Sequence, residues 1–321
     1  MATPPVRFGI SVGGFSGEVP GRQAFIELAR KAEALGFDSV QVGDHIQWHA
    51  PILESTALMA TFAAVTEHVR IVSDVIILPL RDPVLIAKTI ASLDVLSGGR
   101  VIFGIGVGGD HPSDFAAMRI PMKERGARAN ESLEIVKGLW ANERFTYEGK
   151  HFSIRDVAIA PRPLQPSIPI WVGGTSEMAL RRAARYGDGW IAAFSSVGKF
   201  ARLSSDLRAL LQEAGRAVEG FTLGVYLFAN VDDDLARARA AAARYVDRVY
   251  RLDGAQIVER FGVVGPVASC VERALAYAEA GADYIVLGLV SDPRDWPRQL
   301  DGYGEIMERV RRQTPEDGDG E

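Results

Sequence analysis

The segment from Leu93 to Gly109 joins the end of an amphipathic helix to a buried strand that finishes in glycines. Gly98 and Gly99 end the helix, because glycine adopts left-handed dihedral angles at low cost. The apolar run that follows Arg100 is typical of a strand buried on both faces of a parallel sheet. In parallel α/β proteins a ligand meets the backbone just beyond such a strand, so the glycines predict room for a flat cofactor.

The same strand and helix unit recurs along the chain. Eight short apolar segments are predicted to be strands, and segments with helical periodicity separate them. This number of units in 321 residues favours an α/β (β/α)8 TIM barrel, with a doubly wound sheet as the alternative. The predicted strands cover residues 6–12, 37–43, 69–77, 100–107, 169–173, 187–193, 221–229 and 283–288, and the predicted helices cover residues 24–35, 54–67, 83–96, 123–141, 177–186, 199–214, 233–251, 266–280 and 295–312.

Three stretches depart from regular barrel units. Residues 142–168 contain two alternating segments around Gly149 and then a proline-rich run, which predicts a hairpin and a rigid connection inserted before the fifth strand. Residues 252–265 read as an irregular piece, and loops of that size over a barrel mouth are often lids. We therefore predict one domain over residues 1–313 and a disordered acidic tail over residues 314–321.

Charge and composition narrow the class of protein. The formal net charge is −5 and no basic stripe runs along the chain, which argues against a nucleic-acid partner. The sequence has no apolar run long enough to cross a membrane and no signal-peptide core. Cys270 is the sole cysteine, so no internal disulfide can form. These features predict a cytoplasmic protein.

An acid, two imidazoles and an indole follow the second predicted strand, in the segment from Gly43 to His49. An isolated Asp44–His45 pair would more often cap a helix or pack under a loop. Reactive groups of a barrel, however, sit just beyond the carboxyl ends of its strands, and this position favours a catalytic pair with Trp48 beside it.

Three other strand ends carry candidate binding groups. Ser73 and Asp74 interrupt the apolar third strand, which predicts a bulge or strained peptide there, unless the strand ends at Ser73. The glycines from Gly104 to Gly109 match a dinucleotide-binding string, but no helix follows them, so we reject a Rossmann site. The run from Gly173 to Ser176 leads into a helix and predicts an anion site, with a simple N-cap as the alternative.

Together these motifs resemble the luciferase-like monooxygenase family. The resemblance is carried by residues 34–45, 93–109, 125–140, 168–174 and 183–190. It implies a (β/α)8 barrel that binds FMN or the deazaflavin coenzyme F420 at its carboxyl face, usually as a homodimer. The Asp44, His45 and Trp48 constellation is similar to that of the F420-dependent branch, and the family places a non-prolyl cis peptide where this chain has Asp74–Val75.

The resemblance implies hydride transfer between F420 and a small organic substrate. His45 would move the proton, Asp44 would fix the tautomer of His45, and Trp48 would wall the substrate pocket. The residues expected to bind the cofactor are Asp44, Ser73, Asp74, Val75, Gly106, Val107, Gly108, Gly109, Gly173, Gly174, Thr175 and Ser176.

Three alternatives remain open at this point. One is a non-catalytic cofactor-binding protein, because barrels of this family can lose their chemistry and keep the glycines. An FMN-dependent monooxygenase would keep the fold and receive reduced flavin from a partner reductase. A metal-dependent hydrolase would use Asp44, His45 and His49, although the chain has only five histidines and no other ligand-rich strand end. We expect no metal. Phe115, Met118 and Phe261 suggest an apolar substrate.

Overall fold

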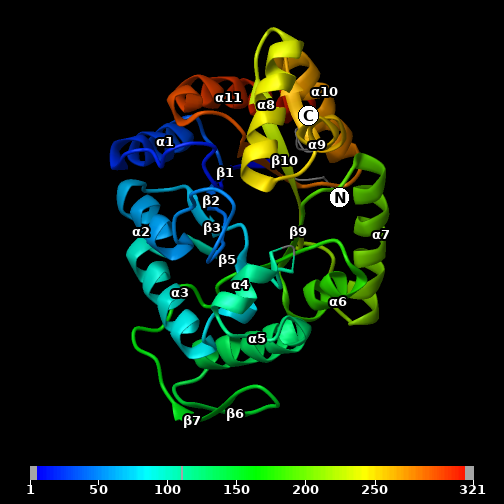
Figure 1. The fold of residues 1–321 in the computed structure, drawn as a ribbon. Coiled ribbons are helices and arrows are strands. Elements are labelled where there is room, and N and C mark those ends of the chain that lie inside the picture. Colours follow the sequence, from blue (N-terminus) through cyan, green and yellow to red (C-terminus); the bar gives the residue numbers. More distant parts are fainter. Residues whose placement is uncertain (1–5, 110, 315–321) are drawn as a thin grey trace, which may run out of the picture.

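In the computed structural model, which describes residues 6–109 and 111–314, parallel strands close into a barrel with helices around it (Figure 1). The order around the barrel is β1, β2, β3, β5, β8, β9, β10 and β12, and β12 pairs again with β1. The pairing of β9 with β10 closes the ring. This closure confirms the (β/α)8 barrel and rules out the doubly wound sheet.

The eight barrel positions coincide with the eight predicted strands. The third position is split, because β4 continues β3 after a break and pairs with β5. The barrel strands are β1 (Arg7–Val12), β2 (Ser39–Val42), β3 (Arg70–Ser73), β4 (Ile76–Ile77), β5 (Val101–Gly106), β8 (Ile170–Gly173), β9 (Gly189–Ala192), β10 (Thr222–Val231) and β12 (Tyr284–Leu289).

The register of the parallel pairs brings the strand ends together. Val12 is paired with Val42, and Val42 with Ser73, so the residues that follow these three strands emerge at one level. The break between β3 and β4 contains the cis peptide bond Asp74–Val75, which confirms the irregularity expected there.

The nine predicted helices are all present, with ends shifted by a few residues. Asp82 caps the third of them by accepting hydrogen bonds from the backbone N–H groups of Val84 and Leu85, both at 2.9 Å, and Gly98 ends it in the left-handed region. The helices are α1 (Arg22–Ala34), α2 (Ser55–Val65), α3 (Pro83–Ser97), α5 (Arg125–Ala141), α6 (Glu177–Tyr186), α7 (Val197–Glu213), α8 (Leu235–Tyr250), α10 (Val267–Glu279) and α11 (Trp296–Gln313).

Four apolar clusters pack the described elements together, and two of them frame the barrel and its mouth. The larger one fills the space between the strands and the helical ring, with Phe8, Ile10 and Phe103 fully buried in it. A smaller one lies at the carboxyl side of β10, where Phe228 packs with residues of α8 and with Phe261. The side chains of the second cluster border the barrel mouth and so shape the cavity there.

The predicted insertion before the fifth strand is a hairpin, as expected. Its strands are β6 (Phe145–Glu148) and β7 (Ser153–Val157), and it projects beyond α5 at the bottom of Figure 1. Glu131 on α5 anchors its turn by accepting from the backbone N–H groups of Lys150, His151 and Phe152.

The prediction of an irregular segment over residues 252–265 is wrong. This stretch forms α9 (Gly254–Phe261) and β11 (Gly262–Gly265), and β11 pairs with the far end of β10. Asp253 caps α9 by accepting from the N–H of Gln256 at 3.0 Å. The carboxyl end of the barrel also carries a short helix, α4 (Pro112–Ala117), that the sequence analysis did not predict.

Three short 3-10 helices complete the elements in the described part of the chain: η1 (Leu78–Leu80), η2 (Met122–Glu124) and η3 (Pro293–Asp295). The predicted disordered tail falls outside the described residues from 315 onward. Within residues 6–109 and 111–314, no helix combines the length and apolarity that a bilayer crossing needs.

Candidate active site

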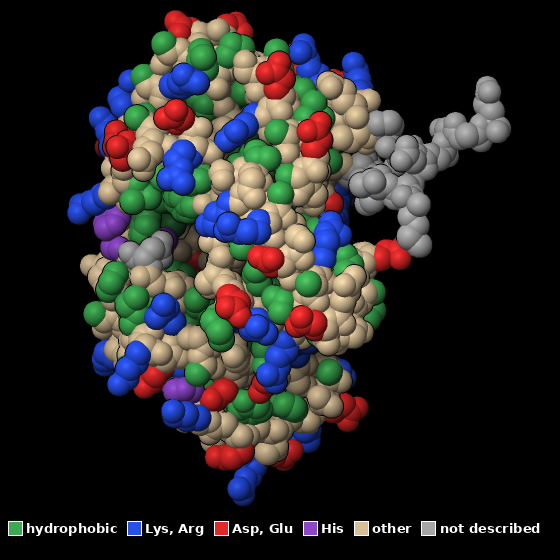
Figure 2. All heavy atoms as spheres, turned by 90° about the vertical axis from the view of Figure 1, so that its right-hand side faces the viewer, with side chains coloured by type: hydrophobic (Ala, Val, Ile, Leu, Met, Phe, Trp, Pro, Cys, Tyr) green, Lys and Arg blue, Asp and Glu red, His purple; other side chains and the backbone are tan. Residues whose placement is uncertain are grey.

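A cavity of about 210 Å³ opens where the carboxyl ends of the barrel strands meet. Figure 2 shows histidine side chains beside a hollow toward the left edge of the molecule, with hydrophobic side chains above it. The lining residues come from most of the barrel positions: Ser11, Gly13, Gly14, Gly43, Asp44, His45, Trp48, Ile52, Asp74, Val75, Ile77, Gly108, Gly173, Gly174, Ile191, Ala193, Phe194, Tyr226, Phe228 and Tyr250.

One part of the cavity wall is bare backbone. Gly108 and Gly174 have positive φ angles of 62° and 120°, which other residues rarely adopt. A methyl group on Gly173 would lie 3.1 Å from Cγ2 of Val75, so even alanine would crowd this wall. This wall of the cavity therefore consists of glycine backbone and the side chain of Val75, which packs against Gly173.

Not every predicted cofactor residue reaches this space. Gly106, Val107, Gly109, Thr175 and Ser176 do not line the cavity. Gly106 packs behind the bulge, because a Cβ there would lie 2.7 Å from Cγ2 of Val75. Ser73 is buried and turned toward β5, where its hydroxyl donates to the carbonyl of Gly104 at 2.8 Å.

His45 has an acidic partner, but that partner is not Asp44. Nδ1 of His45 lies 2.7 Å from Oδ2 of Asp114 on α4. Oδ1 of Asp114 accepts hydrogen bonds from the backbone N–H groups of Ile46 at 3.0 Å and Gln47 at 2.6 Å. The prediction that Asp44 fixes the tautomer of His45 is therefore wrong.

Asp44 instead ties the second strand end to the third. Its carboxylate accepts from the hydroxyl of Ser55 at 2.7 Å, the backbone N–H of Ile77 at 2.9 Å and the guanidinium of Arg81 at 2.6 Å. The side chain is inaccessible to solvent, and Arg81 compensates its charge. Consecutive residues of an extended segment point in opposite directions, which is why Asp44 and His45 face different partners.

Aromatic rings cover the side of the cavity next to His45. Trp48 stacks on His45 with ring centroids 3.7 Å apart and an interplanar angle of 18°. Trp48 also makes edge-to-face contacts with His111 at 5.0 Å and Tyr250 at 5.9 Å. Because Phe194 and Phe228 line the cavity as well, this wall is aromatic and largely apolar.

Asp74 lies at the floor of the cavity, next to Ser11 and Tyr226. It is half-buried, and the water-inaccessible Oδ2 has no hydrogen-bond partner within the described structure. Burial raises the pKa of Asp74 to about 6, and a hydrogen bond with Ser11 offsets only part of that cost. Burial, together with Tyr250 and Tyr245, raises the pKa of Tyr226 well above its ordinary value.

Cations gather beside the predicted anion site, in the loop that follows the cavity-lining Gly173 and Gly174. Lys199 donates to the hydroxyl of Thr175 at 3.0 Å. Burial lowers the pKa of Lys199, and so does the proximity of Arg202 and Arg260. The N-terminus of α6 adds a positive dipole here, with Ser176 as its cap.

Two other arginines of α6 have structural partners. Arg181 forms a surface pair with Glu177, and the buried Arg182 donates to Oδ1 of Asn130 at 2.7 Å. For Ser176, the alternative of a simple N-cap is confirmed, because its hydroxyl accepts from the N–H of Ala179 at 3.3 Å. Thr175 is half-buried and Gly174 is exposed, so Thr175 and the loop backbone remain the candidate anion-binding groups here.

The sequence analysis missed several residues that shape the site: Asp114, Phe194, Lys199, Tyr226, Phe228 and Tyr250. Asp114 follows the fourth barrel strand and Lys199 begins a predicted helix, so both lie where a barrel carries its reactive groups. Phe115, named as a lining residue, is buried beside Ile77 and Leu80, and neither Met118 nor Phe261 lines the cavity. The apolar lining comes from other rings.

The ligand set considered for a metal is not assembled. Asp44 and His45 turn to different partners, and His49 packs edge-to-face on His111 with centroids 4.4 Å apart. No group of three His, Cys, Asp or Glu side chains placed to hold a metal ion occurs among the residues that the structure describes.

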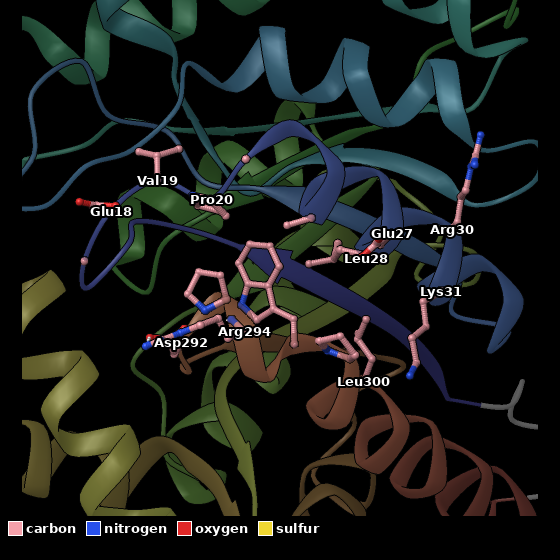
Figure 3. A pocket seen from close by; sticks show the side chains of 16 residues that line it. Glu18, Val19, Pro20, Glu27, Leu28, Arg30, Lys31, Asp292, Arg294 and Leu300 are labelled. Carbon is pink, nitrogen blue, oxygen red and sulfur yellow. Dashed lines mark hydrogen bonds and ion pairs between the residues drawn. The ribbon is translucent and has the colours of Figure 1, made fainter.

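A larger groove of about 1070 Å³ lies outside the barrel, between α1 and the segment that leads into α11 (Figure 3). Arg30, Lys31 and Glu18 on its rim point away from one another in this view. Lys31 pairs with Asp301 at 2.7 Å, and Arg294 pairs with Asp292 at 2.8 Å. The groove has volume but no converging reactive groups.

Comparisons with known proteins agree with this architecture. The model of the luciferase-like monooxygenase family matches residues 6–256. An F420-dependent glucose-6-phosphate dehydrogenase from Beutenbergia cavernae is 32% identical over 319 residues, covering 87% of this chain and 91% of that protein. An uncharacterized protein of Mycobacterium tuberculosis is 35% identical over 228 residues, covering 62% and 78%.

Two solved structures share the fold at lower identity. The monooxygenase RslO1 from Streptomyces bottropensis has a TM-score of 0.84 at 24% identity, over 94% of this chain and 99% of that one. An F420-dependent secondary alcohol dehydrogenase in complex with an F420–acetone adduct has a TM-score of 0.82 at 19% identity, over 95% and 99%.

Proposed function

Because this chain belongs to the luciferase-like monooxygenase family, we propose that it is an F420-dependent oxidoreductase acting on a small organic substrate. The family match confirms the resemblance seen in the motifs. The observation that carries the proposal is one cavity with two different ends: His45, held by Asp114 and covered by Trp48, and a glycine loop with Lys199 beside it.

The residues present fit a flat ring with an anionic tail. Gly108, Gly173 and Gly174 line the cavity with backbone alone, and the side chain of Val75 packs beside Gly173, so no long side chain projects where the ring would lie. The unpartnered Oδ2 of Asp74 suits an N–H donor on the edge of the ring. Thr175, Lys199 and the N-terminus of α6 suit a phosphate.

In this proposal each group has a chemical task. When bound, F420 supplies or accepts a hydride at its ring carbon. His45 handles the accompanying proton: it removes one from a substrate hydroxyl when the substrate is oxidised, and returns one when the substrate is reduced. Trp48 and the neighbouring aromatic rings exclude water from the substrate and hold its apolar part.

An FMN-dependent monooxygenase remains the second candidate. It is favoured by the likeness in fold to RslO1, a monooxygenase. Such an enzyme would draw reduced flavin from a partner reductase. The glycine wall and the anion site at Thr175 would suit FMN equally well. The two proposals are therefore distinguished by which cofactor the protein binds.

We also propose a homodimer formed through α2 and α3. Leu85 and Leu96 on α3 are exposed at 64% and 69%, and their spacing places them on one face of the helix. Ala57 and Ala64 on α2 are exposed too. Sedimentation should give a dimer at micromolar concentration, and the double variant Leu85→Glu, Leu96→Glu should be monomeric; a monomeric wild type would contradict this assembly.

For the compartment we propose the cytoplasm, since the free Cys270 is buried and needs no oxidising environment.

Titration of the purified protein with F420 and with FMN, each oxidised and reduced, tests the cofactor. We expect saturable quenching of F420 fluorescence with a micromolar or tighter Kd, and FMN binding at least tenfold weaker. Binding of reduced FMN alone would transfer the assignment to the monooxygenase. Binding of neither would refute the redox proposal.

A further inference from the structure

We propose that Asp114 is the positioning residue for His45: it holds the imidazole in the tautomer with the proton on Nδ1, so that Nε2 is the proton acceptor that serves the cavity. The inference rests on the proposed function only for its catalytic meaning. The tautomer itself follows from contacts within this chain.

The carboxylate of Asp114 is fixed by three hydrogen bonds. Oδ2 contacts Nδ1 of His45 at 2.7 Å, while Oδ1 accepts from the N–H groups of Ile46 and Gln47. The side chain of Asp114 is 1% exposed, so water does not compete for these bonds. The carboxylate therefore cannot turn away from His45 without leaving two backbone donors unpaired.

These contacts decide which nitrogen carries the proton. Two backbone N–H groups donate to Oδ1 of Asp114 and stabilise the ionised carboxylate, and an ionised carboxylate only accepts hydrogen bonds at either oxygen. Nδ1 of His45 must then be the donor, which leaves the lone pair of the neutral ring on Nε2.

The plane of the ring is fixed from a second direction. Trp48 stacks on it at 3.7 Å, and His111, which precedes α4, lies edge-on at 6.0 Å. Asp114 and His111 both belong to the segment after β5, whereas His45 and Trp48 follow β2. Docking of α4 on the β2 loop thus orients the imidazole, and His45 itself borders the cavity.

The proton balance of the proposed reaction requires this arrangement. If the substrate were an alcohol, its C–H hydride would pass to the bound cofactor and its O–H proton to Nε2 of His45, and a carbonyl product would remain. The imidazolium so formed keeps its Nδ1–H bond to Asp114, which stabilises the positive charge. In the reverse reaction the bound cofactor would supply the hydride, and Nε2 of His45 would return the proton.

The direct test is the tautomer of His45 in protein labelled with ¹⁵N at histidine, measured by long-range ¹H–¹⁵N correlation above the titration range of imidazole. His45→Gln assigns the signal. We expect a protonated Nδ1 and a bare Nε2 in the wild type. In Asp114→Asn the side-chain amide can donate to Nδ1, so the proton should move to Nε2.

Asp234→Asn is the matched control. Asp234 also accepts from two backbone N–H groups, those of Ala236 and Arg237, but it caps α8 far from His45 in the sequence. This variant should leave the His45 signals unchanged. If Asp114→Asn does not fold, the wild-type spectrum still decides the question.

Two results would overturn the inference: a wild-type His45 that carries its neutral-state proton on Nε2, or an Asp114→Asn spectrum that matches the wild type. The measurement needs neither cofactor nor substrate. A failure of F420 to bind would therefore refute the proposed function while leaving the tautomer result standing, and the two failures can be told apart.

Discussion

The two ends of the cavity are built in different ways. At the glycine end, Gly173, Gly174 and the start of α6 offer backbone groups, and Lys199 is the main side chain. At the aromatic end, His45 and Trp48 depend on side chains from other elements, above all Asp114. Backbone groups bind an anion of any shape, whereas side chains held from two directions fix one atom for proton transfer.

This contrast predicts that substitutions at the two ends affect different properties, turnover at one end and cofactor affinity at the other. Changes at the aromatic end should lower turnover and leave cofactor affinity nearly intact. Changes at the glycine end should do the reverse. Substitutions of His45 and Lys199 test this separation, and a substitution of Asp74 tests the ionisable group on the cavity floor. They follow in decreasing order of the change in free energy that each should cause.

His45→Ala should lower F420-linked turnover by about 10²- to 10⁴-fold, because it removes the group that moves the proton. The Kd for F420 should change less than about threefold, since binding relies on the other end. Turnover is followed by the absorbance of F420. His68→Ala, in a segment at the amino side of β3, is the control and should behave as wild type. Equal losses of affinity and turnover would show that the two ends do not act separately.

Asp74→Asn should stabilise the protein in alkaline solution. The pKa of Asp74 is raised to about 6 in the folded state, so ionising it costs folding free energy. The sign follows: the penalty is absent below about pH 4, grows as the pH rises, and is complete above about pH 6. Urea unfolding should therefore show a gain that reaches at most about 3 kcal/mol at pH 8 and vanishes near pH 4.

A gain that is equal at both pH values would show that Asp74 does not titrate in this range. Thr61→Ser, a hydroxyl-preserving change on α2, serves as the control for handling and should show no pH-dependent difference. The same variant of Asp74 also informs on how the two ends are joined, because its carboxyl lies on the floor that they share.

Lys199→Ala should weaken F420 binding by about tenfold, the size of one hydrogen bond to a charged group. Binding of 8-hydroxy-5-deazariboflavin, which lacks the phosphate, should be unchanged. Arg181→Ala is the matched control, since Arg181 pairs with Glu177 on the surface. If both ligands lose affinity equally, Lys199 supports the fold of the loop and does not contact the phosphate.

The same contrast explains what the sequence could reveal. Strand order, helix order and the glycine loops follow from periodicity and from residues with special backbone freedom, such as Gly98 and Gly174. These local signals located the barrel, the hairpin and the break at Asp74. The glycine end could therefore be predicted from the sequence, because its proposed function depends on backbone geometry.

The residues that hold His45 at the aromatic end could be identified only from the structure. Asp114 is 69 positions from His45, and no spacing rule connects them. Asp44 was chosen because it is adjacent to His45 in the sequence, but consecutive side chains of an extended segment face apart, and Arg81 pairs with the carboxylate of Asp44. α9 and β11 were missed because they are short: α9 has eight residues, below the length over which helical periodicity is usually read, and β11 is a four-residue strand of two glycines and two valines.

We infer that one cavity holds the cofactor phosphate at its glycine end and presents the reacting ring to His45 at the other. A crystal structure of the protein soaked with F420 is the decisive experiment. We expect phosphate density at the backbone of Gly174 to Ser176, with the ring between Val75 and the side of the cavity that carries His45. Density with the phosphate elsewhere, or with the ligand in the groove beside α1, would contradict this division of the cavity.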